Sequence, residues 1–334
     1  MQDKYISLAH GNGGRYMREL IEELFARHLA NPGLDIHCDA VPLALPAGET
    51  LFTTDGFTVQ PLEFPGGSIG SLAVHGTTND LAVAGAEPRY LSLNAFIEEG
   101  MEIAQLDRII ASLAAAAADI GVQVVAGDTK VLRRGEGSGL YLATTGVGTR
   151  ASGVRLGLDC IRDGDRVLVS GPIGDHGIAV LLAREQFGLR GDLQSDAASV
   201  LPLTRAALGF SGLRFMRDPT RGGLVTVCHE ILQQTGMGIR LQQQQVPVRD
   251  SVQSVCDILG YDPWYLACEG RVVAVVSPQQ ADELLSVWQA LPDGAAAAVI
   301  GQIDRQLDRV SLITELGGER MLEELEDDPL PRIC

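Results

Sequence analysis

The sequence has 334 residues, of which 46% are hydrophobic and 39 are glycine, and this fits a soluble globular protein of about two domains. Asp and Glu outnumber Lys and Arg by 43 to 26, which gives a formal net charge of −17. Such a charge argues against a surface for nucleic acid or for an anionic membrane, although not against a nucleotide ligand.

Neither a secretion signal nor a membrane span is evident. The N-terminus lacks a basic region followed by an apolar core, and no run of about 18 apolar residues occurs. The six cysteines include no C-x-x-C pair suited to zinc, so we expect reduced thiols, mostly buried. These features predict a cytoplasmic protein.

Hydrophobic periodicity and stop signals predict alternating helices and strands in the first half of the chain. The expected elements are a helix over 20–30, a strand over 49–59, a helix over 68–84, a strand over 89–97, a helix over 104–120, and strands over 122–128 and 139–149. The fold class is therefore mixed α/β.

The pattern restarts near residue 157, where an Asp-Gly-Asp turn precedes a predicted strand over 166–171. We therefore expect two domains, 1–157 and 158–318. The last stretch, 319–334, is rich in acidic residues and is expected to be a mobile tail.

Three aspartates stand at corresponding points of these elements. Asp55 and Asp128 close two predicted strands, and Asp80 lies on the helix between them. Strand ends converge on one rim of a sheet, and carboxylate oxygens suit Mg²⁺, so we expect the three to meet around this ion. Lys130 could contact a phosphate oxygen. Taken singly, each aspartate is more simply a turn residue, and Lys130 an exposed lysine.

Two glycine-bearing loops could hold anions through backbone N–H groups. The first, HGNGG at 10–14, is too short for a Walker A loop and is weak evidence alone. The second, SGPIGDHG at 170–177, places a turn between a strand and a helix whose N-terminus could receive phosphate. His176 in this loop could equally be a capping or packing residue.

A third loop, RDPTRGG at 217–223, puts Asp218, Thr220 and Arg221 before a helix start. Arg221 has the planar fork that grips phosphate or carboxylate, although a solvated arginine is the simpler interpretation.

Glu269 is the expected general base. It lies between the apolar stretch WYLA and the strand RVVAVV, where partial desolvation would raise its pKa. Glu230, about two turns into the helix after the third loop, and a water molecule remain alternatives.

The sequence finishes on PLPRIC, and Cys334 is its last residue. A thiol on a tail of about 16 residues could sweep up to roughly 50 Å and so visit a second enzyme and return. Cys334 could therefore be a carrier of substrate, and the competing interpretation is an incidental cysteine.

In this order, the motifs HGNGG, TTDGF, TTNDLAVAGAEP, AGDTKV, SGPIGDHG, RDPTRGG and PRIC resemble those of an ATP-binding superfamily. This superfamily contains aminoimidazole ribonucleotide synthetase, selenophosphate synthetase and thiamine-monophosphate kinase, and the resemblance is closest to the HypE family of carbamoyl dehydratases. The motifs span essentially the whole chain.

The resemblance implies an N-terminal α+β domain whose strands pair with those of a second subunit, and a C-terminal α/β domain. It implies ATP and Mg²⁺ as cofactors, with Asp55, Asp80 and Asp128 as metal ligands. The remaining nucleotide-binding residues that it implies are His10, Gly11, Gly13, Gly14, Asn79, Thr129, Gly174, Asp175, His176, Asp218 and Thr220.

The resemblance also implies the reaction. Cys334 would receive a carbamoyl group from the carbamoyltransferase HypF, and ATP-dependent dehydration would convert it to a thiocyanate. The cyanide would pass to iron held by a HypC–HypD complex, for [NiFe]-hydrogenase. Lys130, Arg221 and Glu269 would assist. The chain departs from the family in having Cys268, where Asn usually precedes the glutamate, which puts the hydrogen bonding around Glu269 in doubt.

Two alternatives remain open from the sequence. One is another ATP-dependent enzyme of the superfamily that phosphorylates a free small molecule, for which Cys334 would be dispensable. The other is a non-catalytic scaffold or thiol carrier, which would bind metal through cysteine without ATP turnover.

Overall fold

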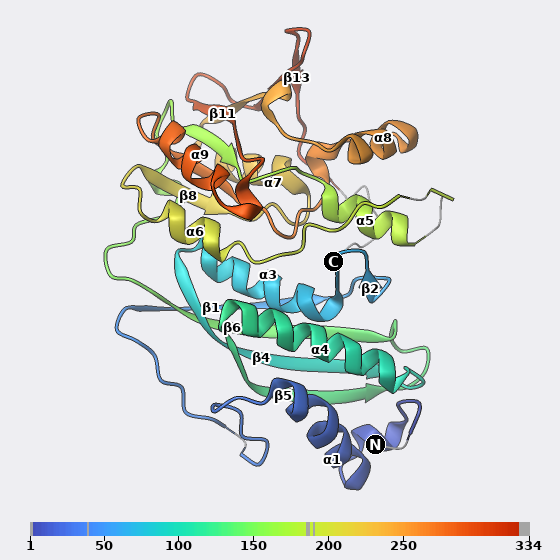
Figure 1. Ribbon diagram of the computed structural model, residues 1–334. Coiled ribbons are helices and arrows are strands. Elements are labelled where there is room, and N and C mark those ends of the chain that lie inside the picture. The colour runs from blue at the N-terminus through green and yellow to red at the C-terminus, as the bar shows by residue number, and fades with distance from the viewer. Residues whose placement is uncertain (1–2, 39, 185–187, 190, 327–334) are drawn as a thin grey trace. The chain divides into compact units, whose positions relative to one another are not determined.

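The computed structural model describes residues 3–38, 40–184, 188–189 and 191–326. They form two compact units, each described here by itself (Figure 1). Unit 1 contains the described residues of Met1–Leu81 and Ala86–Ser152, and unit 2 contains those of Ala82–Gly85 and those from Gly153 onward. The main division at Ser152 thus lies close to the position predicted from sequence.

Unit 1 is built on a four-stranded sheet in the order β1-β6-β4-β5. Its strands are β1 (Glu49–Phe57), β4 (Ala86–Glu98), β5 (Gln123–Leu132) and β6 (Leu140–Arg150). Because β6 is antiparallel to β1 and β4, and β5 is parallel to β4, the strands β1, β4 and β5 run in the same direction. β1 and β5 are the two edges of the sheet.

Helices α3 (Ile69–Val83) and α4 (Ile103–Ile120) cover one face of this sheet (Figure 1). The two helices touch through backbone: a β-carbon on Gly70 would lie 2.2 Å from the carbonyl oxygen of Ile109. α4 ends at Gly121, whose φ of 80° suits only glycine, as the sequence predicts.

The predicted helix over 20–30 is longer than expected. It comprises α1 (Arg15–Leu20), a π-helical segment η2 (Ile21–Ala26) and α2 (Arg27–Leu29), preceded by the 3₁₀ turn η1 (Leu8–Gly11). A short hairpin of β2 (Glu63–Phe64) and β3 (Gly67–Ser68) leads into α3.

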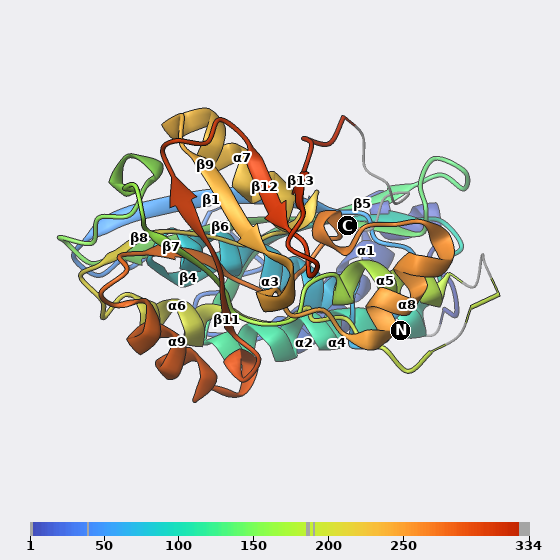
Figure 2. The same cartoon turned by 90° about the horizontal axis from the view of Figure 1, so that it is seen from above.

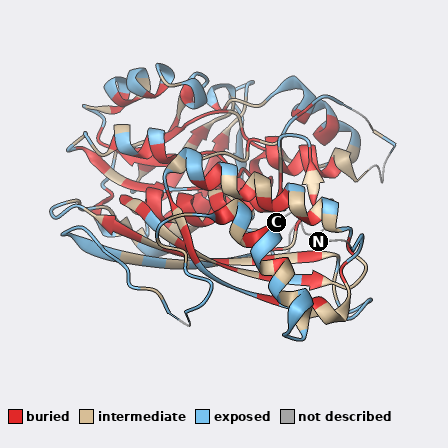
Figure 3. Ribbon diagram, turned by 60° about the horizontal axis from the view of Figure 1, so that its bottom comes forward, coloured by how far each residue is buried: buried red, intermediate tan, exposed pale blue. Residues whose placement is uncertain are grey.

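The other face of the unit 1 sheet is exposed. Side chains alternate between the covered and the uncovered face, which the burial colours of Figure 3 follow along the strands. Two phenylalanines stand on the uncovered face: Phe52 is 69% exposed and Phe96 is 36% exposed. Phenylalanine is usually buried, so two exposed phenylalanines on one face of a sheet are a notable feature.

Unit 2 is built on a seven-stranded sheet in the order β13-β12-β9-β11-β7-β10-β8 (Figure 2). Its strands are β7 (Arg166–Val169), β8 (Leu213–Arg217), β9 (Gly238–Gln242), β10 (Val273–Val276), β11 (Ala298–Asp304), β12 (Val310–Ile313) and β13 (Glu319–Met321). Every pairing is antiparallel except that of β9 with β12.

Helices cover both faces of this sheet, and the predicted α/β class is confirmed. Helix α7 (Gly223–Thr235) covers one face, and helices α6 (Leu201–Ala207) and α9 (Ala281–Gln289) cover the other (Figure 1). Helices α5 (Asp175–Ala183) and α8 (Asp250–Leu259) contact each other. All four residues of β10 are buried, as expected for a strand covered on both sides. Among the described residues, no helix is both long and apolar enough to cross a membrane.

The predicted start of the tail at residue 319 is wrong. Residues 319–321 form β13, which pairs with β12 at the sheet edge, and Leu322 is 1% exposed with its N–H bonded to the carbonyl of Val310. The carbonyl of Glu323 accepts the hydroxyl of Tyr265 at 2.9 Å. An acidic composition does not prevent alternate residues from pairing and packing. Residues 327–334, with Cys334, lie outside the described part.

Candidate functional site

Asp55 and Asp80 lie together where β1 packs against α3. The Oδ2 atom of Asp55 lies 3.5 Å from the place that a β-carbon on Gly76 would take. One helical turn further on, Asp80 accepts a hydrogen bond from Thr53 Oγ1 at 2.9 Å. Thr53 and Asp55 share a face of β1 because they are two residues apart. The predicted nucleotide residue Asn79 is buried on α3.

Asp128 does not join them within one chain. Asp55 pairs with Thr144, and this row across the sheet continues through Leu93 to Gly127, so Asp128 points to the opposite face. Three strand spacings, about 14 Å, also separate β5 from β1. The predicted convergence of three aspartates is therefore wrong, because the order of strands in the sheet cannot be read from their order in the chain.

The donor set of unit 1 still fits Mg²⁺. Among the described residues, no group of three or more His, Cys, Asp or Glu could hold a metal ion. Mg²⁺ is usually bound through one or two carboxylates, with phosphate oxygens and water as the other ligands. Asp55 and Asp80 supply two carboxylates from adjoining elements, which suits Mg²⁺ that arrives with a phosphate.

Asp128 has a different neighbour. Its Oδ2 lies 2.9 Å from Lys130 Nζ, and both side chains are more than half exposed. Asp128 and Thr129 also line a cavity of about 180 Å³ whose other walls are mainly apolar side chains from the first helical segment, the 34–41 loop and β5. The Thr129 hydroxyl is buried there without a hydrogen-bond partner among the described residues, so a polar ligand atom could satisfy it.

The first two residues of the HGNGG loop are packed against the rest of unit 1, and its last two glycines are not. His10 is 1% exposed, with Nδ1 at 3.0 Å from Ser7 Oγ. Gly11 packs against β5, since a β-carbon there would lie 2.8 Å from the side chain of Val131. Gly13 and Gly14 have positive φ of 75° and 82° and no neighbour that a β-carbon would touch. The backbone that could approach a phosphate is therefore that of the last two glycines.

In unit 2, the SGPIGDHG loop turns at Gly174 (φ 81°), which precedes α5. Asp175 is buried, and its Oδ2 accepts a hydrogen bond from Arg249 Nε at 2.8 Å. Burial raises the pKa of Asp175, and the bond from Arg249 opposes that rise. His176 is fully buried with Nδ1 at 2.8 Å from Ser195 Oγ, which favours its packing role over a contact with phosphate.

The RDPTRGG loop is tied to the segment that carries Glu269. The N–H of Cys268 donates to the carbonyl of Pro219 at 3.0 Å, and Thr220 accepts the N–H of Gly223 at 3.0 Å. A β-carbon on Gly223, whose φ is +62°, would lie 2.6 Å from the carbonyl oxygen of Leu266. Only glycine permits this approach. Asp218, the first of the predicted residues in this loop, is 8% exposed.

The two charged alternatives near this loop differ. Arg221 is exposed, and no carboxylate of the described residues forms an ion pair with it. Glu230 accepts two bonds from the guanidinium of Arg217, at 2.9 and 2.6 Å. Glu230 is thus held by a guanidinium, whereas Glu269 is buried, and Glu269 remains the base that we favour.

Glu269 is 4% exposed, which confirms the desolvation expected from its apolar surroundings. Its backbone N–H donates to Asp196 Oδ1 at 3.1 Å. The neighbouring Cys268 is fully buried, and its sulfur accepts the N–H of Gly174 at 3.2 Å. Burial raises the pKa of the Cys268 thiol well above its usual value, so it stays protonated at this position.

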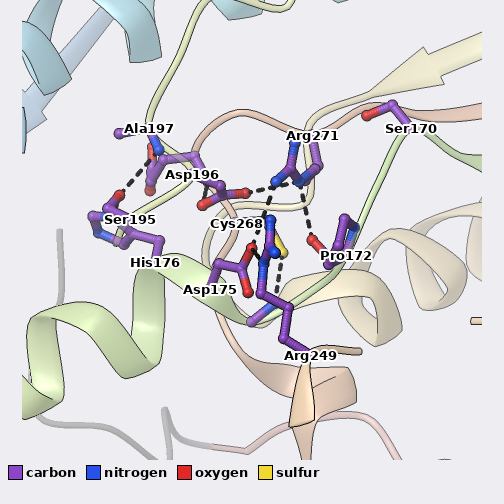
Figure 4. A network of polar contacts seen from close by, with 12 residues as sticks. Ser170, Pro172, Asp175, His176, Ser195, Asp196, Ala197, Arg249, Cys268 and Arg271 are labelled. Atoms are coloured by element: carbon purple, nitrogen blue, oxygen red, sulfur yellow. Dashed lines mark hydrogen bonds and ion pairs between the residues drawn. The ribbon is translucent and has the colours of Figure 1, made fainter. Parts of the chain in front are cut away.

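Arg271 connects these loops (Figure 4). Its guanidinium lies 3.3 Å from Asp196 Oδ2 and 3.6 Å from Asp175 Oδ2, and its Nε donates to the carbonyl of Pro172 at 3.0 Å. The side chains of both aspartates are almost inaccessible to water. Sequence reasoning missed Asp196 and Arg271 because neither stands in a recognisable motif. The position of Arg271, two residues after Glu269, was the one available signal.

Family models and relatives agree on the identity of the chain. The model described as AIR synthase related protein, N-terminal domain, matches residues 38–150, and the model of the C-terminal domain matches residues 162–311. Carbamoyl dehydratase HypE of Azotobacter vinelandii is 46% identical over 98% of this chain and 97% of its own length.

Two solved structures are also similar. Hydrogenase maturation protein HypE in complex with ATP has a TM-score of 0.93 and 41% identity, covering 98% of this chain and 99% of that one. The HypE–HypF complex includes a chain with a TM-score of 0.81 and 39% identity, covering 92% and 99%. The chain therefore belongs to the HypE carbamoyl dehydratase family, within the AIR synthase related proteins.

Proposed function

We infer that this chain is an ATP-dependent carbamoyl dehydratase that acts in hydrogenase maturation. Its full-length likeness to carbamoyl dehydratases carries this inference. The buried Glu269, held where the loops of unit 2 are tied together, is the feature of the chain that suits the reaction best. The substrate is the S-carbamoyl group on Cys334, and the product is the S-cyanate that supplies cyanide to [NiFe]-hydrogenase.

Dehydration of a thiocarbamate needs a better leaving group than an amide oxygen. The carbamoyl oxygen attacks the γ-phosphate of ATP, ADP leaves, and the oxygen becomes a phosphate ester. One proton leaves nitrogen as this ester forms, which gives a C=NH group. A base then removes the second proton from nitrogen as inorganic phosphate departs, which leaves the C≡N group on sulfur. Phosphoryl transfer asks the protein mainly for positioning and for neutralisation of charge.

The residues divide these tasks. Asp55 and Asp80 would hold Mg²⁺, which when bound neutralises phosphate charge. The exposed guanidinium of Arg221 and the ammonium of Lys130 interact with anionic oxygens, and Gly13 and Gly14 let backbone approach a phosphate. Glu269 takes the proton from nitrogen, as a carboxylate that the loops of unit 2 hold away from bulk water.

Mass spectrometry of the peptide that contains Cys334 tests the function. Incubation with a HypF-type carbamoyltransferase, carbamoyl phosphate and ATP should add a carbamoyl group, and the loss of one water should then follow only when ATP is present. Cys334→Ala should keep ATP binding and form no thiocyanate. Phosphorylation of a free small molecule by Cys334→Ala would instead support the kinase alternative.

We also propose that the chain works as a homodimer in the cytoplasm, with HypF as the donor of the carbamoyl group and HypC–HypD as the acceptor of cyanide. The uncovered face of the unit 1 sheet, with Phe52 and Phe96, suits a second copy of the chain. The cysteines at 38, 160, 228, 256 and 268 are free thiols, in keeping with a reducing compartment.

Phe52→Arg tests the dimer. The substitution places a charge on this face without removing a buried side chain, so the monomer should fold and sediment as a monomer. A dimer of unchanged affinity would exclude this surface.

A further inference from the structure

We propose that Asp196 is a positioning residue that fixes the backbone of the catalytic glutamate through a buried carboxylate clamp. The inference rests on the proposed role of Glu269 as general base. Asp196 belongs to an irregular segment between α5 and α6 that carries no recognisable motif. Its side chain is fully buried, and its Oδ1 atom accepts the N–H of Glu269 at 3.1 Å.

The irregular segment that carries Asp196 and the loop that carries Glu269, called the glutamate loop below, also touch through their backbones. A β-carbon on Gly270 would lie 1.9 Å from the carbonyl oxygen of Asp196 and 3.0 Å from the backbone nitrogen of Ala198. Every residue other than glycine is therefore excluded at position 270. The carboxylate of Asp196 fixes the position of Glu269, and this steric contact fixes the residue that follows.

Arg271 extends the clamp to the start of α5. It bridges the carboxylates of Asp196 and Asp175, at 3.3 and 3.6 Å, and donates to the carbonyl of Pro172 at 3.0 Å (Figure 4). A second contact joins the same two segments, since His176 Nδ1 lies 2.8 Å from Ser195 Oγ. The SGPIGDHG loop and the glutamate are therefore held by one scaffold.

Stability alone gives little reason for such a cluster. Two carboxylates and a guanidinium lose hydration when they are buried, and apolar residues of similar volume often stabilise a fold as well or better. Ion pairs and hydrogen bonds depend on direction, so they fix the positions of the groups that they join. A displacement of about 1 Å in a reacting group lowers rates by about a hundredfold. A clamp that fixes the backbone of a general base therefore increases the reaction rate.

Asp196→Asn is the decisive variant, because the amide oxygen can still accept the N–H of Glu269 while Arg271 loses a counter-charge. At saturating ATP, single-turnover dehydration of carbamoylated Cys334 should slow by about tenfold or more. The slowing should persist at temperatures well below the unfolding midpoint, where the variant is fully folded. A purely structural role would move the unfolding midpoint alone.

Asp165→Asn is the matched control. Asp165 is likewise a buried aspartate of unit 2, with its Oδ2 bonded to the N–H of Arg162 at 2.7 Å and 3.6 Å from Arg214 Nε. It should lower the unfolding midpoint and leave the dehydration rate unchanged. If Asp196→Asn does not fold, Arg271→Lys keeps the charge, loses the planar fork and should also slow dehydration.

Three results would overturn the proposal. One is an Asp196→Asn enzyme with the wild-type rate. Another is equal slowing by Asp165→Asn at the same loss of stability. The third is a wild-type enzyme that forms no thiocyanate at all, in which case the proposed function fails first and the positioning role fails with it.

Discussion

The two units of the chain present their polar residues in different ways. In unit 1, Asp128 and Lys130 are more than half exposed on an open sheet face, and the exposed glycines of the HGNGG loop have no close neighbour. In unit 2, Asp175, His176, Asp196 and Glu269 are buried, and the loops that carry them touch through glycine backbone.

The difference separates two ways of building a site. Unit 2 fixes its groups before any ligand arrives, because several contacts determine each backbone position. Unit 1 leaves its charged groups in reach of a ligand, a metal ion or a second subunit. We therefore expect substitutions in unit 2 to act through packing, and those in unit 1 to act through pH and solvent access.

The largest effect is expected from Gly270→Ala in unit 2. The new β-carbon would lie 1.9 Å from the carbonyl of Asp196, so the glutamate loop must move, at a cost of about 4 kcal/mol or more. Gly236→Ala is the control: its φ of +68° is also positive, but no atom lies within 4 Å of a β-carbon there. It should cost about 1–2 kcal/mol. Equal urea midpoints for the two variants would contradict the locked backbone of unit 2.

His75 on α3 should make unit 1 sensitive to acid. Burial lowers the pKa of His75 from 6.5 to about 4, so the folded state disfavours the charged ring. This contribution to stability is present above pH 6.5 and is lost as the pH falls towards 4, by about 3 kcal/mol. His75→Gln should flatten the decline of the urea midpoint over this range. A decline as steep as that of wild type would mean that other groups cause it.

Glu98 should also make unit 1 less stable as the pH falls, by a smaller amount and at a lower pH than His75. The N–H groups of Gly135 and Gly139 donate to its carboxylate at 2.6 and 2.9 Å and hold the pKa of Glu98 below its usual value. The stabilisation is present above the unfolded pKa and is lost as the pH falls through the folded one. Glu98→Gln should therefore be less stable than wild type at pH 7 and equally stable in strong acid. A stability difference that persists in acid would point to lost packing.

The reactivity of the cysteine thiols should differ between the two units, and this test requires no change in stability. Cys38 is exposed in unit 1, whereas Cys228 and Cys268 are fully buried in unit 2. In a Cys334→Ala background, a neutral thiol reagent should modify Cys38 in the native chain, and the buried pair only after urea is added. Rapid native labelling of Cys268 would show that the glutamate loop opens.

The sequence predicted the elements well because helix and strand periodicity and glycine stops are local signals. The helix ended by Gly121, the strand that holds Asp55 and the burial of Glu269 were all predicted correctly. Each of these features depends on residues within a few positions along the chain.

The errors concern features that depend on distant residues. Asp128 was expected beside Asp55, yet strand order places the two on opposite edges and faces of the sheet. Asp196 was not singled out, because its importance comes from the backbone of Glu269, 73 positions away. Residues 319–321 were assigned to a tail because they form a strand, β13, only by pairing with β12, and a local sequence pattern does not reveal this partner.

The pairing of β13 has a consequence for Cys334. The last backbone contact described is at Glu323, and Gln233 donates to the side chain of Glu324 at 2.8 Å. Ten residues then lead to Cys334, and they can span at most about 35 Å. An acceptor that reacts with this thiol must therefore come within that distance of Glu324. For the proposed role of Cys334 as a carrier, the contacts of β13 and of the two residues at 323 and 324 therefore set an upper limit on how far the thiol can lie from unit 2.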